Sequence, residues 1–145
     1  MTEETQIIQR PQGLSPLTLA FMGDAVYEVF VRRELIRQSG SMPAHALHER
    51  AVELVRCSAQ AKAYLFLNDS GLLEETEADV LRRGRNNSSV KCPKNANLMD
   101  YRMATGVEAL FGYLFLAGKQ GRMEELFRMI LERASITEEE ESRQR

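Results

Sequence analysis

The sequence has too little cysteine for a disulfide scaffold and no segment that could cross a membrane. Its two cysteines, Cys57 and Cys92, form no C-x-x-C pair, and together with His45 and His48 they lack the spacing of a zinc site. No apolar run approaches the roughly 18 residues of a transmembrane helix. The polar residues 1–13 also lack the apolar centre of a signal peptide. These absences predict a soluble, cytoplasmic protein with reduced thiols.

Excess positive charge, the usual mark of a nucleic-acid-binding protein, is absent from the chain as a whole. The net charge is -2, so any basic surface must be local. A chain of 145 residues with 43% hydrophobic and 28% charged residues is typical of one globular domain. We expect three parts: an N-terminal arm at 1–14, a catalytic domain at 15–134, and a charged, frayed C-terminal tail at 135–145.

Strand-like alternation and internal repeats are also missing, and every long periodic segment is typical of a helix. Ser15 followed by Pro16 predicts the start of the first helix, and Gly40 and Pro43 predict its end. Further helices are expected from about 42 to 67, from 72 to 83 with Gly84 as the residue after the helix, from 98 to 116, and from about 123 onward. The fold class is therefore predicted to be all-α, with five or more helices.

Two carboxylates interrupt otherwise apolar helical segments. Asp24 lies within LAFMGDAVYEVFV, and Glu108 lies within ATGVEALFGYLFLAG. Burying an unpaired carboxylate is costly, and neither acid has a basic residue three or four positions later, whereas Glu28 has Arg32. A basic partner from elsewhere in the fold would satisfy both acids. The alternative is that both acids bind one divalent metal ion.

Magnesium is the ion that such an acid pair favours. Mg²⁺ prefers hard oxygen ligands and keeps several waters, so one or two carboxylates plus substrate phosphate oxygens are sufficient. The ion lowers the pKa of a bound water and neutralises charge on the scissile phosphate, which is the chemistry of phosphodiester hydrolysis. The pair therefore predicts catalytic and metal-binding roles for Asp24 and Glu108, with Mg²⁺ as cofactor and Mn²⁺ as a substitute.

Positive charge is concentrated between residues 82 and 94, in RRGRNNSSVKCPK. The basic residues of this segment are Arg82, Arg83, Arg85, Lys91 and Lys94, and it contains no acid. Lysine and arginine neutralise phosphates, while amides and hydroxyls supply positioning contacts. The segment therefore predicts an RNA-binding loop of about fourteen residues (84–97). The alternative is a solvated loop that is basic without binding RNA.

Two segments resemble the ribonuclease III family. The first, LAFMGDAVYEVFVRREL, resembles its signature through Gly23, Asp24, Ala25 and Val26. The second, TGVEALFGYLFL, resembles its second acidic motif through Glu108, Ala109 and Gly112. The basic segment before the second motif is most similar to the Mini-III branch, which consists of the catalytic domain without a double-stranded RNA-binding domain. The resemblance extends over about 15–131.

This resemblance implies an all-α ribonuclease III-type endonuclease domain, a helical bundle that works as a homodimer. It implies Mg²⁺-dependent cleavage of double-stranded RNA and, for the Mini-III branch, maturation of the ends of the 23S ribosomal RNA precursor. Without a separate RNA-binding domain, affinity would come from the catalytic surface, with the segment 82–94 of both protomers gripping the duplex. A ribosomal protein is a further candidate partner, and no membrane is involved.

The chain departs from the classical family pattern at two acidic positions. Ala20 and Thr105 stand where the classical enzymes have acids. Thr105 is able to hydrogen-bond a metal-bound water but supplies no charge, so we expect weaker metal binding and a greater need for RNA phosphate. The same departures leave open a non-catalytic double-stranded RNA-binding scaffold of the ribosome. A helical dimerisation or regulatory protein without an RNA role is a third hypothesis.

Overall fold

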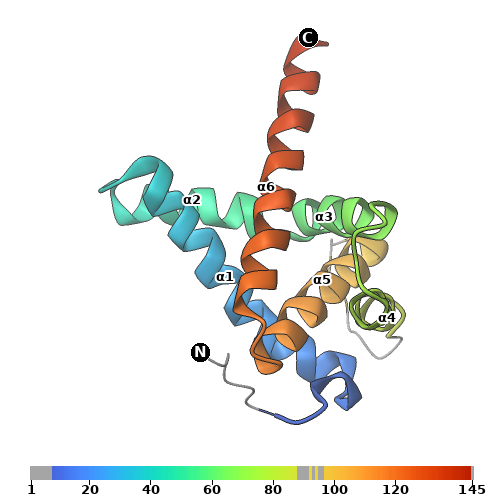
Figure 1. Ribbon diagram of the computed structural model, residues 1–145. Coiled ribbons are helices and arrows are strands. Elements are labelled where there is room, and N and C mark those ends of the chain that lie inside the picture. Colours follow the sequence, from blue (N-terminus) through green and yellow to red (C-terminus); the bar gives the residue numbers. More distant parts are fainter. Residues whose placement is uncertain (1–7, 88–91, 93, 95–96, 145) are drawn as a thin grey trace.

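The computed structural model describes residues 8–87, 92, 94 and 97–144, apart from the side chains of 136–139 and 141 (Figure 1). A 3₁₀ helix η1 (Pro11–Gly13) precedes α1 (Pro16–Ser39), α2 (Ala44–Val55), α3 (Cys57–Asp69), α4 (Glu75–Arg85), α5 (Leu98–Leu116) and α6 (Gln120–Arg143). These residues contain no strand, so the predicted all-α class is confirmed. In the same part of the chain, no helix combines the length and the apolarity needed to cross a lipid bilayer.

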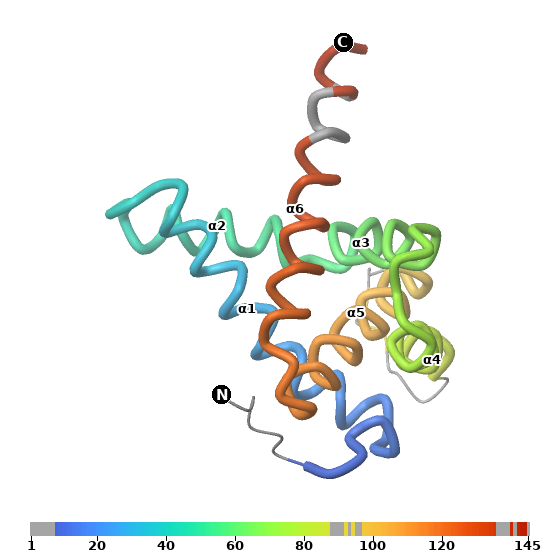
Figure 2. Tube along the Cα trace, viewed as in Figure 1, coloured from blue at the N-terminus to red at the C-terminus, as the bar shows by residue number. Residues whose placement is uncertain are grey.

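Helix α5 is the centre of the bundle, with α1, α3 and α4 packed around it (Figures 1 and 2). Its residues from Met103 to Leu116 are almost all buried, as is typical of a helix that is apolar nearly all round. Tyr27 of α1 meets Phe111 of α5 and Phe127 of α6 edge to face, with ring centroids 5.2 and 5.5 Å apart. Helices α1, α5 and α6 therefore share one aromatic core.

Two glycines let α1 and α5 cross with their backbones in contact. A Cβ atom on Gly23 of α1 would overlap the backbone carbonyl of Glu108, and one on Gly112 of α5 would overlap the carbonyl of Leu19. Glycine alone has no Cβ, and a Cβ at either point would force the helices apart. The crossing therefore fixes where the backbone of α1 lies relative to that of α5.

The structure divides the expected second helix into α2 and α3, so the prediction of one continuous helix is wrong. The break is at Arg56, whose extended backbone (φ -62°, ψ 155°) ends α2 and precedes α3. The buried side chain of Gln60 donates a hydrogen bond of 2.9 Å to the carbonyl of Val55, which satisfies an acceptor at the end of α2. No glycine or proline marks this break, and the apolar periodicity continues through it. The sequence therefore gives no sign that the helix ends there.

Helix α4 differs from the prediction at both ends. It begins three residues later than expected, where the side chains of Glu74 and Glu77 form a capping box. Gly84 lies inside the helix, so its predicted role as the residue after the helix is wrong. A Cβ atom on Gly84 would lie 2.7 Å from the Cα of Gly106 on α5. Gly84 is therefore a position of close packing between α4 and α5.

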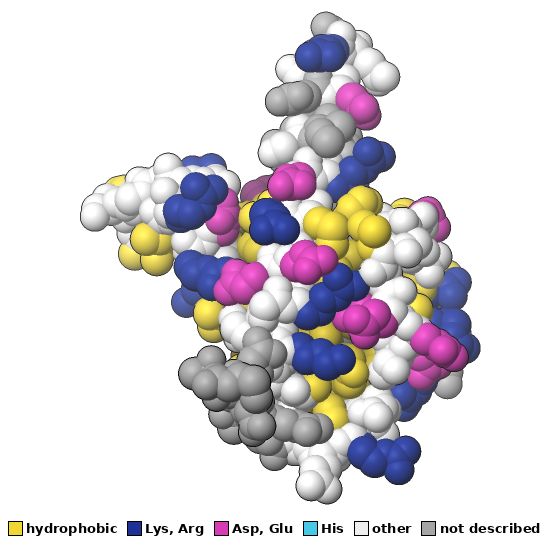
Figure 3. Space-filling model, in the orientation of Figure 1, with side chains coloured by type: hydrophobic (Ala, Val, Ile, Leu, Met, Phe, Trp, Pro, Cys, Tyr) yellow, Lys and Arg dark blue, Asp and Glu magenta, His cyan; other side chains and the backbone are white. Residues whose placement is uncertain are grey.

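Helix α6 crosses the bundle and then extends beyond it to Arg143, so most of the expected C-terminal tail is part of this helix, and its fraying stays a prediction (Figure 1). Residues 122–143 contain no glycine or proline and are rich in glutamate and arginine, which favour helix. Basic and acidic side chains are interspersed along the face that α6 crosses (Figure 3). The first half of the helix is anchored by buried Met123, Leu126, Phe127 and Ile130.

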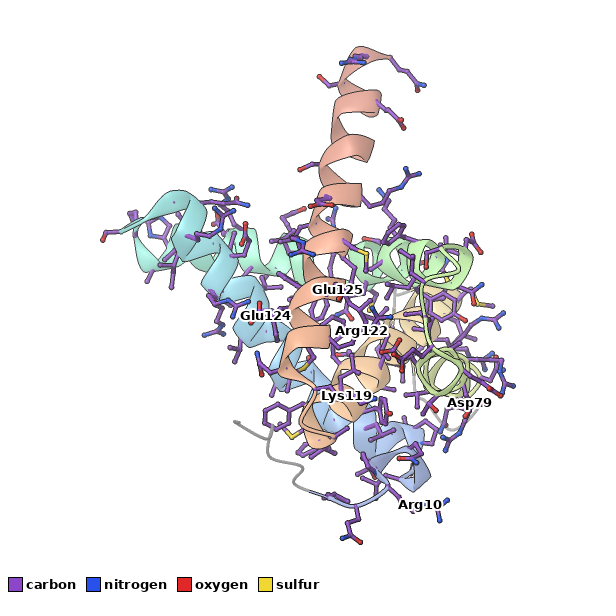
Figure 4. The ribbon with its side chains drawn as sticks, in the orientation of Figure 1. Arg10, Asp79, Lys119, Arg122, Glu124 and Glu125 are labelled. Atoms are coloured by element: carbon purple, nitrogen blue, oxygen red, sulfur yellow. The ribbon has the colours of Figure 1, made fainter. Side chains whose placement is uncertain are left out.

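A buried ion pair connects α4 to α6. Glu77 is 1% exposed and accepts hydrogen bonds from Nε and Nη2 of Arg122 at 2.9 and 2.8 Å. Arg122 also donates to the carbonyl of Leu72 and pairs with Glu125, one turn further along α6 (Figure 4). Burial alone would raise the pKa of Glu77, but the hydrogen bonds from Arg122 and from the Glu74 backbone hold it below its ordinary value.

Candidate functional site

Asp24 and Glu108 lie together where α1 crosses α5. The residue before Asp24 is Gly23, whose backbone is packed against the carbonyl of Glu108. The Asp24 carboxyl is a hydrogen-bond partner of the Glu108 carboxyl. Asp24 is exposed and Glu108 is half-buried. The structure therefore brings together the two acids that stand 84 positions apart in the sequence (108 minus 24).

The environment of the pair opposes ionisation of both acids. Burial, followed by the hydrogen bond and the negative charge of Asp24, raises the pKa of Glu108 to about 8. Two carboxylates this close cannot both ionise at low cost unless a positive charge joins them. At neutral pH the Glu108 carboxyl therefore holds a proton when no cation is present, and a divalent ion would take the place of that proton.

Basic side chains of the described residues do not neutralise the acid pair. Among the described residues, no lysine or arginine forms a salt bridge with Asp24 or Glu108, whereas Glu28 pairs with Arg32 at 3.2 Å as expected. That part of the chain also has no group of three or more histidine, cysteine or acidic side chains arranged to hold a metal. The pair thus offers two hard carboxylate ligands, which fits an ion that keeps waters or binds phosphate oxygens.

The charge of Glu108 acts on two further side chains. Tyr101 precedes Glu108 on α5, and Cys57 is the first residue of α3. Burial is the largest cause that raises the pKa of each, and the negative charge of Glu108 is the second. Thr105 is 5% exposed, and its hydroxyl donates to the carbonyl of Tyr101 at 2.9 Å. That hydroxyl donates within the helix but keeps its acceptor lone pairs, so a hydrogen bond from a metal-bound water stays a prediction, and Ala20 is buried without any polar group.

The predicted RNA-binding residues are divided between a helix end and the segment after it. Arg82, Arg83 and Arg85 belong to the last turn of α4 rather than to a loop, Lys94 is exposed in a turn, and Lys91 lies outside the described residues. Because Gly84 packs on Gly106, this basic helix end lies beside the turn of α5 that leads to Glu108. No basic side chain, however, is among the causes of the Glu108 pKa shift, which are burial and Asp24.

The three arginines of α4 have different surroundings. Arg83 donates to the carbonyls of Gln12 and Leu14 at 2.8 and 3.3 Å, which holds the chain before α1 against α4. Arg82 is exposed, and Arg85 is half-buried. Arg83 therefore has a structural contact of its own, and RNA binding by any of the three stays a prediction.

Sequence reasoning did not single out Arg102. This residue follows Tyr101 on the first turns of α5 and is half-buried, and its Nε is buried without a hydrogen-bond partner in the described part of the chain. A buried donor without a partner is costly. A basic residue eight positions after the basic segment was the available signal, and it was missed because Arg102 lies within a helix.

Two grooves of the molecule lie away from the acid pair. Grooves of about 670 and about 390 Å³ lie against α3 and α6 and between α1 and α2, and neither is lined by Asp24 or Glu108.

A family model of the ribonuclease III domain matches residues 17–119. The chain belongs to the ribonuclease III family. Among its relatives in that family, a Mini-ribonuclease 3 of Thermoanaerobacter sp. is 41% identical over 129 residues, which cover 88% of this chain and 89% of the relative. A Mini-ribonuclease 3 of Symbiobacterium thermophilum is 44% identical over 119 residues, covering 82% and 89%.

A solved structure shares the fold of this chain. The crystal structure of a Fusobacterium nucleatum protein matches with a TM-score of 0.72 over 83% of this chain and 93% of that chain, at 23% identity. The resemblance inferred from the two acidic motifs is therefore confirmed, and the chain is a ribonuclease III-type endoribonuclease. Enzymes of this type act on double-stranded RNA and generally depend on a divalent metal.

Proposed function

We propose that this ribonuclease III-type enzyme cleaves double-stranded RNA with Mg²⁺ held by Asp24 and Glu108, and that Mn²⁺ substitutes for Mg²⁺. The observation that supports this most strongly is the meeting of two carboxylates with no basic partner in the described residues. When bound, a divalent ion activates a water and neutralises charge on the scissile phosphate.

Each acid has its own part in this proposal. Exposed Asp24 lies on the side that a substrate can reach, and half-buried Glu108 releases its proton and supplies the second carboxylate. Both side chains are carried by rigid helices in backbone contact, which keeps the ligands in position. Arg82, Arg83, Arg85, Lys91 and Lys94 are proposed to contact RNA phosphates, which are sequence-independent contacts.

An apolar stripe on α1 supports a homodimer as the active unit. Leu17, Phe21, Val29 and Ile36 are 37, 84, 63 and 57% exposed and lie along one side of the helix. Contiguous exposed apolar surface typically marks an interaction site. Asp24 lies only about 20° around the helix from Leu17, so two copies paired through the stripe would each place an acid pair beside the interface, facing one RNA duplex.

The proposed natural substrate is the double-stranded stem at the ends of the 23S ribosomal RNA precursor, processed in the cytoplasm, with a ribosomal protein as a candidate accessory partner. The support is the similarity, at 36–44% identity, to proteins named Mini-ribonuclease 3. An A-form duplex is recognised chiefly by its shape and phosphates. The catalytic surface can therefore select a stem without reading its base sequence in full.

The test is cleavage of a defined RNA duplex by Asp24→Asn, Glu108→Gln and a control, Glu28→Gln, whose acid pairs with Arg32 on the same helix as Asp24. The first two variants are expected to lose roughly 10²- to 10³-fold in rate, because metal coordination contributes several kcal/mol to transition-state stabilisation. The control should match the wild type. Staggered product ends with 5′-phosphates would agree with ribonuclease III chemistry.

Wild-type cleavage by Asp24→Asn or by Glu108→Gln would remove that acid from the mechanism. Duplex binding without strand scission in either Mg²⁺ or Mn²⁺ would instead favour a non-catalytic RNA-binding scaffold. Binding should weaken steeply as salt concentration rises, since phosphate contacts release counterions.

A further inference from the structure

We propose that Arg102 of α5 and Arg85 of α4 form a phosphate-binding pair that holds the backbone of the duplex RNA substrate. Arg102 belongs to neither acidic motif and to no part of the basic segment 82–94. The inference deepens the proposed contact between that segment and RNA, and it does not depend on the metal site.

Arg102 lacks an anionic partner within the protein. It is half-buried, and its Nε is buried without a hydrogen-bond partner, whereas Nη1 and Nη2 reach solvent. Among the described residues, no acid forms a salt bridge with it. A partly buried charge without a counter-ion costs stability. An anion that reaches this guanidinium therefore gains more than it would at an arginine that is already paired.

Arg85 is the arginine of the last turn of α4 whose charge is not balanced by an acid. Arg82 and Arg83 lie 2.6 and 3.8 Å from the carboxylate of Asp79. Arg85 donates instead to the neutral Oδ1 of Asn86 at 3.1 Å, and it has no acidic partner in the part of the chain that the structure describes. Its charge is therefore available to a ligand.

The packing around Tyr64 brings these two arginines to one place. Helices α3 and α4 both pack on α5 (Figures 1 and 2). A Cβ atom on Gly106 of α5 would lie 3.1 Å from the ring of Tyr64, which belongs to α3. The Arg85 guanidinium lies 6.0 Å from the centre of the same ring. Arg102 is one turn before Gly106 on the same face of α5.

The direction of α4 agrees with this arrangement. Near the start of α4, Glu77 pairs with Arg122, which follows the C-terminal end of α5. The end of α4 packs instead against Gly106, in the first half of α5. Helix α4 therefore runs toward the N-terminal turns of α5, so Arg85 lies at the end of α5 that carries Arg102.

Two guanidinium groups without acidic partners suit the phosphates of a duplex. Arginine presents a planar fork of N–H donors that matches phosphate oxygens, and a duplex is bound chiefly through its shape and phosphates. No basic side chain is among the causes that shift the pKa of Glu108, so the arginine pair lies away from the acids. We therefore expect it to contribute to RNA affinity and not to the chemical step.

The test measures binding of a fluorescently labelled RNA duplex by anisotropy over a range of salt concentrations, with divalent ions removed so that the RNA stays intact. Arg102→Met and Arg85→Met are compared with Arg56→Met, which removes an exposed arginine that pairs with Glu53. Each of the first two variants should weaken binding about 10-fold at roughly 0.1 M salt and reduce the slope of log affinity against log salt by about 1. The control should match the wild type.

Two further readouts separate phosphate binding from a structural role. Because Arg102→Met removes a buried donor without a partner, its melting temperature should equal or exceed that of the wild type. In RNA cleavage, its KM should rise by the same factor as the dissociation constant, while kcat at saturating RNA stays at the wild-type value. Arg102→Lys keeps the positive charge and should restore the salt slope.

Wild-type RNA affinity and salt slope in Arg102→Met would overturn the pair, and weakened binding by Arg85→Met alone would leave the basic segment as an RNA contact. A lower melting temperature of Arg102→Met with unchanged RNA binding would make Arg102 a scaffold residue. Calorimetric titration with inorganic phosphate tests the other source of this anion: loss of phosphate binding in Arg102→Met with wild-type duplex affinity would overturn RNA as the ligand.

These outcomes are independent of the acid pair. The metal site is tested by the cleavage rates of Asp24→Asn and Glu108→Gln, both of which should bind the duplex with the wild-type salt slope. Full cleavage by those variants would refute the metal site and leave the arginine pair standing.

Discussion

The proton on Glu108 should control how tightly the site binds a divalent ion. Burial and the neighbouring Asp24 raise the pKa of Glu108 to about 8, so below this pH an ion must displace a proton. Each pH unit below that pKa costs about tenfold in apparent affinity, because proton and ion compete for the same carboxylate. From pH about 6 to about 8, the apparent Mg²⁺ affinity should rise roughly 100-fold and then level off.

The same proton affects the stability of the metal-free chain. Above the ordinary pKa of 4.5, the unfolded chain has released the Glu108 proton, whereas the folded chain keeps it up to about pH 8. The unfolded state then binds fewer protons, so the free energy of unfolding falls as pH rises through this range, by about 1.4 kcal/mol per pH unit from this group. Saturating Mg²⁺ should abolish the fall, because the ion replaces the proton.

Calorimetric titration of Mg²⁺ in two buffers with different ionisation enthalpies measures the protons released. We expect about one proton per ion near pH 6 and almost none above pH about 9. Glu108→Gln should release none, while Glu28→Gln, which changes a carboxylate paired with Arg32, should behave as the wild type. Metal binding that is independent of pH between about 6 and 8, with no proton release, would refute a shared ion on Asp24 and Glu108.

Three further predictions concern the scaffold. Glu77→Ala leaves Arg122 partly buried without its main partner, so urea denaturation should show a loss of about 3–5 kcal/mol. Phe21→Ala removes an 84% exposed ring from each side of the proposed two-fold interface, about 3–6 kcal/mol in all, and sedimentation should show dimerisation weakened roughly 10²- to 10⁴-fold. Gly112→Ala forces α1 and α5 apart and should lower both the melting temperature and the cleavage rate, whereas Gly13→Ala, with no atom within 4 Å of the new Cβ, should change neither.

Each of these predictions has a contrary outcome. Wild-type stability of Glu77→Ala would mean that the buried ion pair contributes no net stability. Unchanged dimerisation of Phe21→Ala would place the interface on a surface other than the α1 stripe. Wild-type melting of Gly112→Ala would mean that α5 can move away from α1 without cost.

The helices whose ends are marked by local chemistry could be predicted from the sequence. Ser15 accepts a hydrogen bond from the Leu17 amide, Pro16 occupies the first helical position, and Gly40 ends α1 with φ 59°. These signals lie within a few residues of each helix end. They therefore specify the ends of α1 without knowledge of the rest of the fold.

The errors arose where the cause was not local or had no distinctive residue. The break at Arg56 uses an extended backbone that any residue adopts, so the composition of the segment gives no sign of it. Gly84 has the composition of a helix end, but its contact is with Gly106, on a helix that begins only after the basic segment. Only the packed structure distinguishes a glycine that ends a helix from one that admits another helix.

The candidate site could be predicted only where its residues stand out locally in the sequence. Asp24 and Glu108 are conspicuous because a carboxylate in an apolar segment needs an explanation. Tyr101 lies on the same helical face as Glu108, but a tyrosine on a mostly apolar face is typical of a core position. Cys57 feels the charge of Glu108 only because α3 packs against α5. The spacing of residues within α5 cannot indicate where α3 lies.

The contact between Gly23 and Gly112 has a consequence for protein engineering. Because main-chain atoms set the crossing of α1 and α5, the separation of positions 24 and 108 does not depend on which side chains occupy them. Histidines at both positions would present imidazole nitrogens, which suit Zn²⁺, Ni²⁺ or Cu²⁺ better than Mg²⁺. The helix crossing could therefore serve as a scaffold for artificial metalloproteins with a different ion preference.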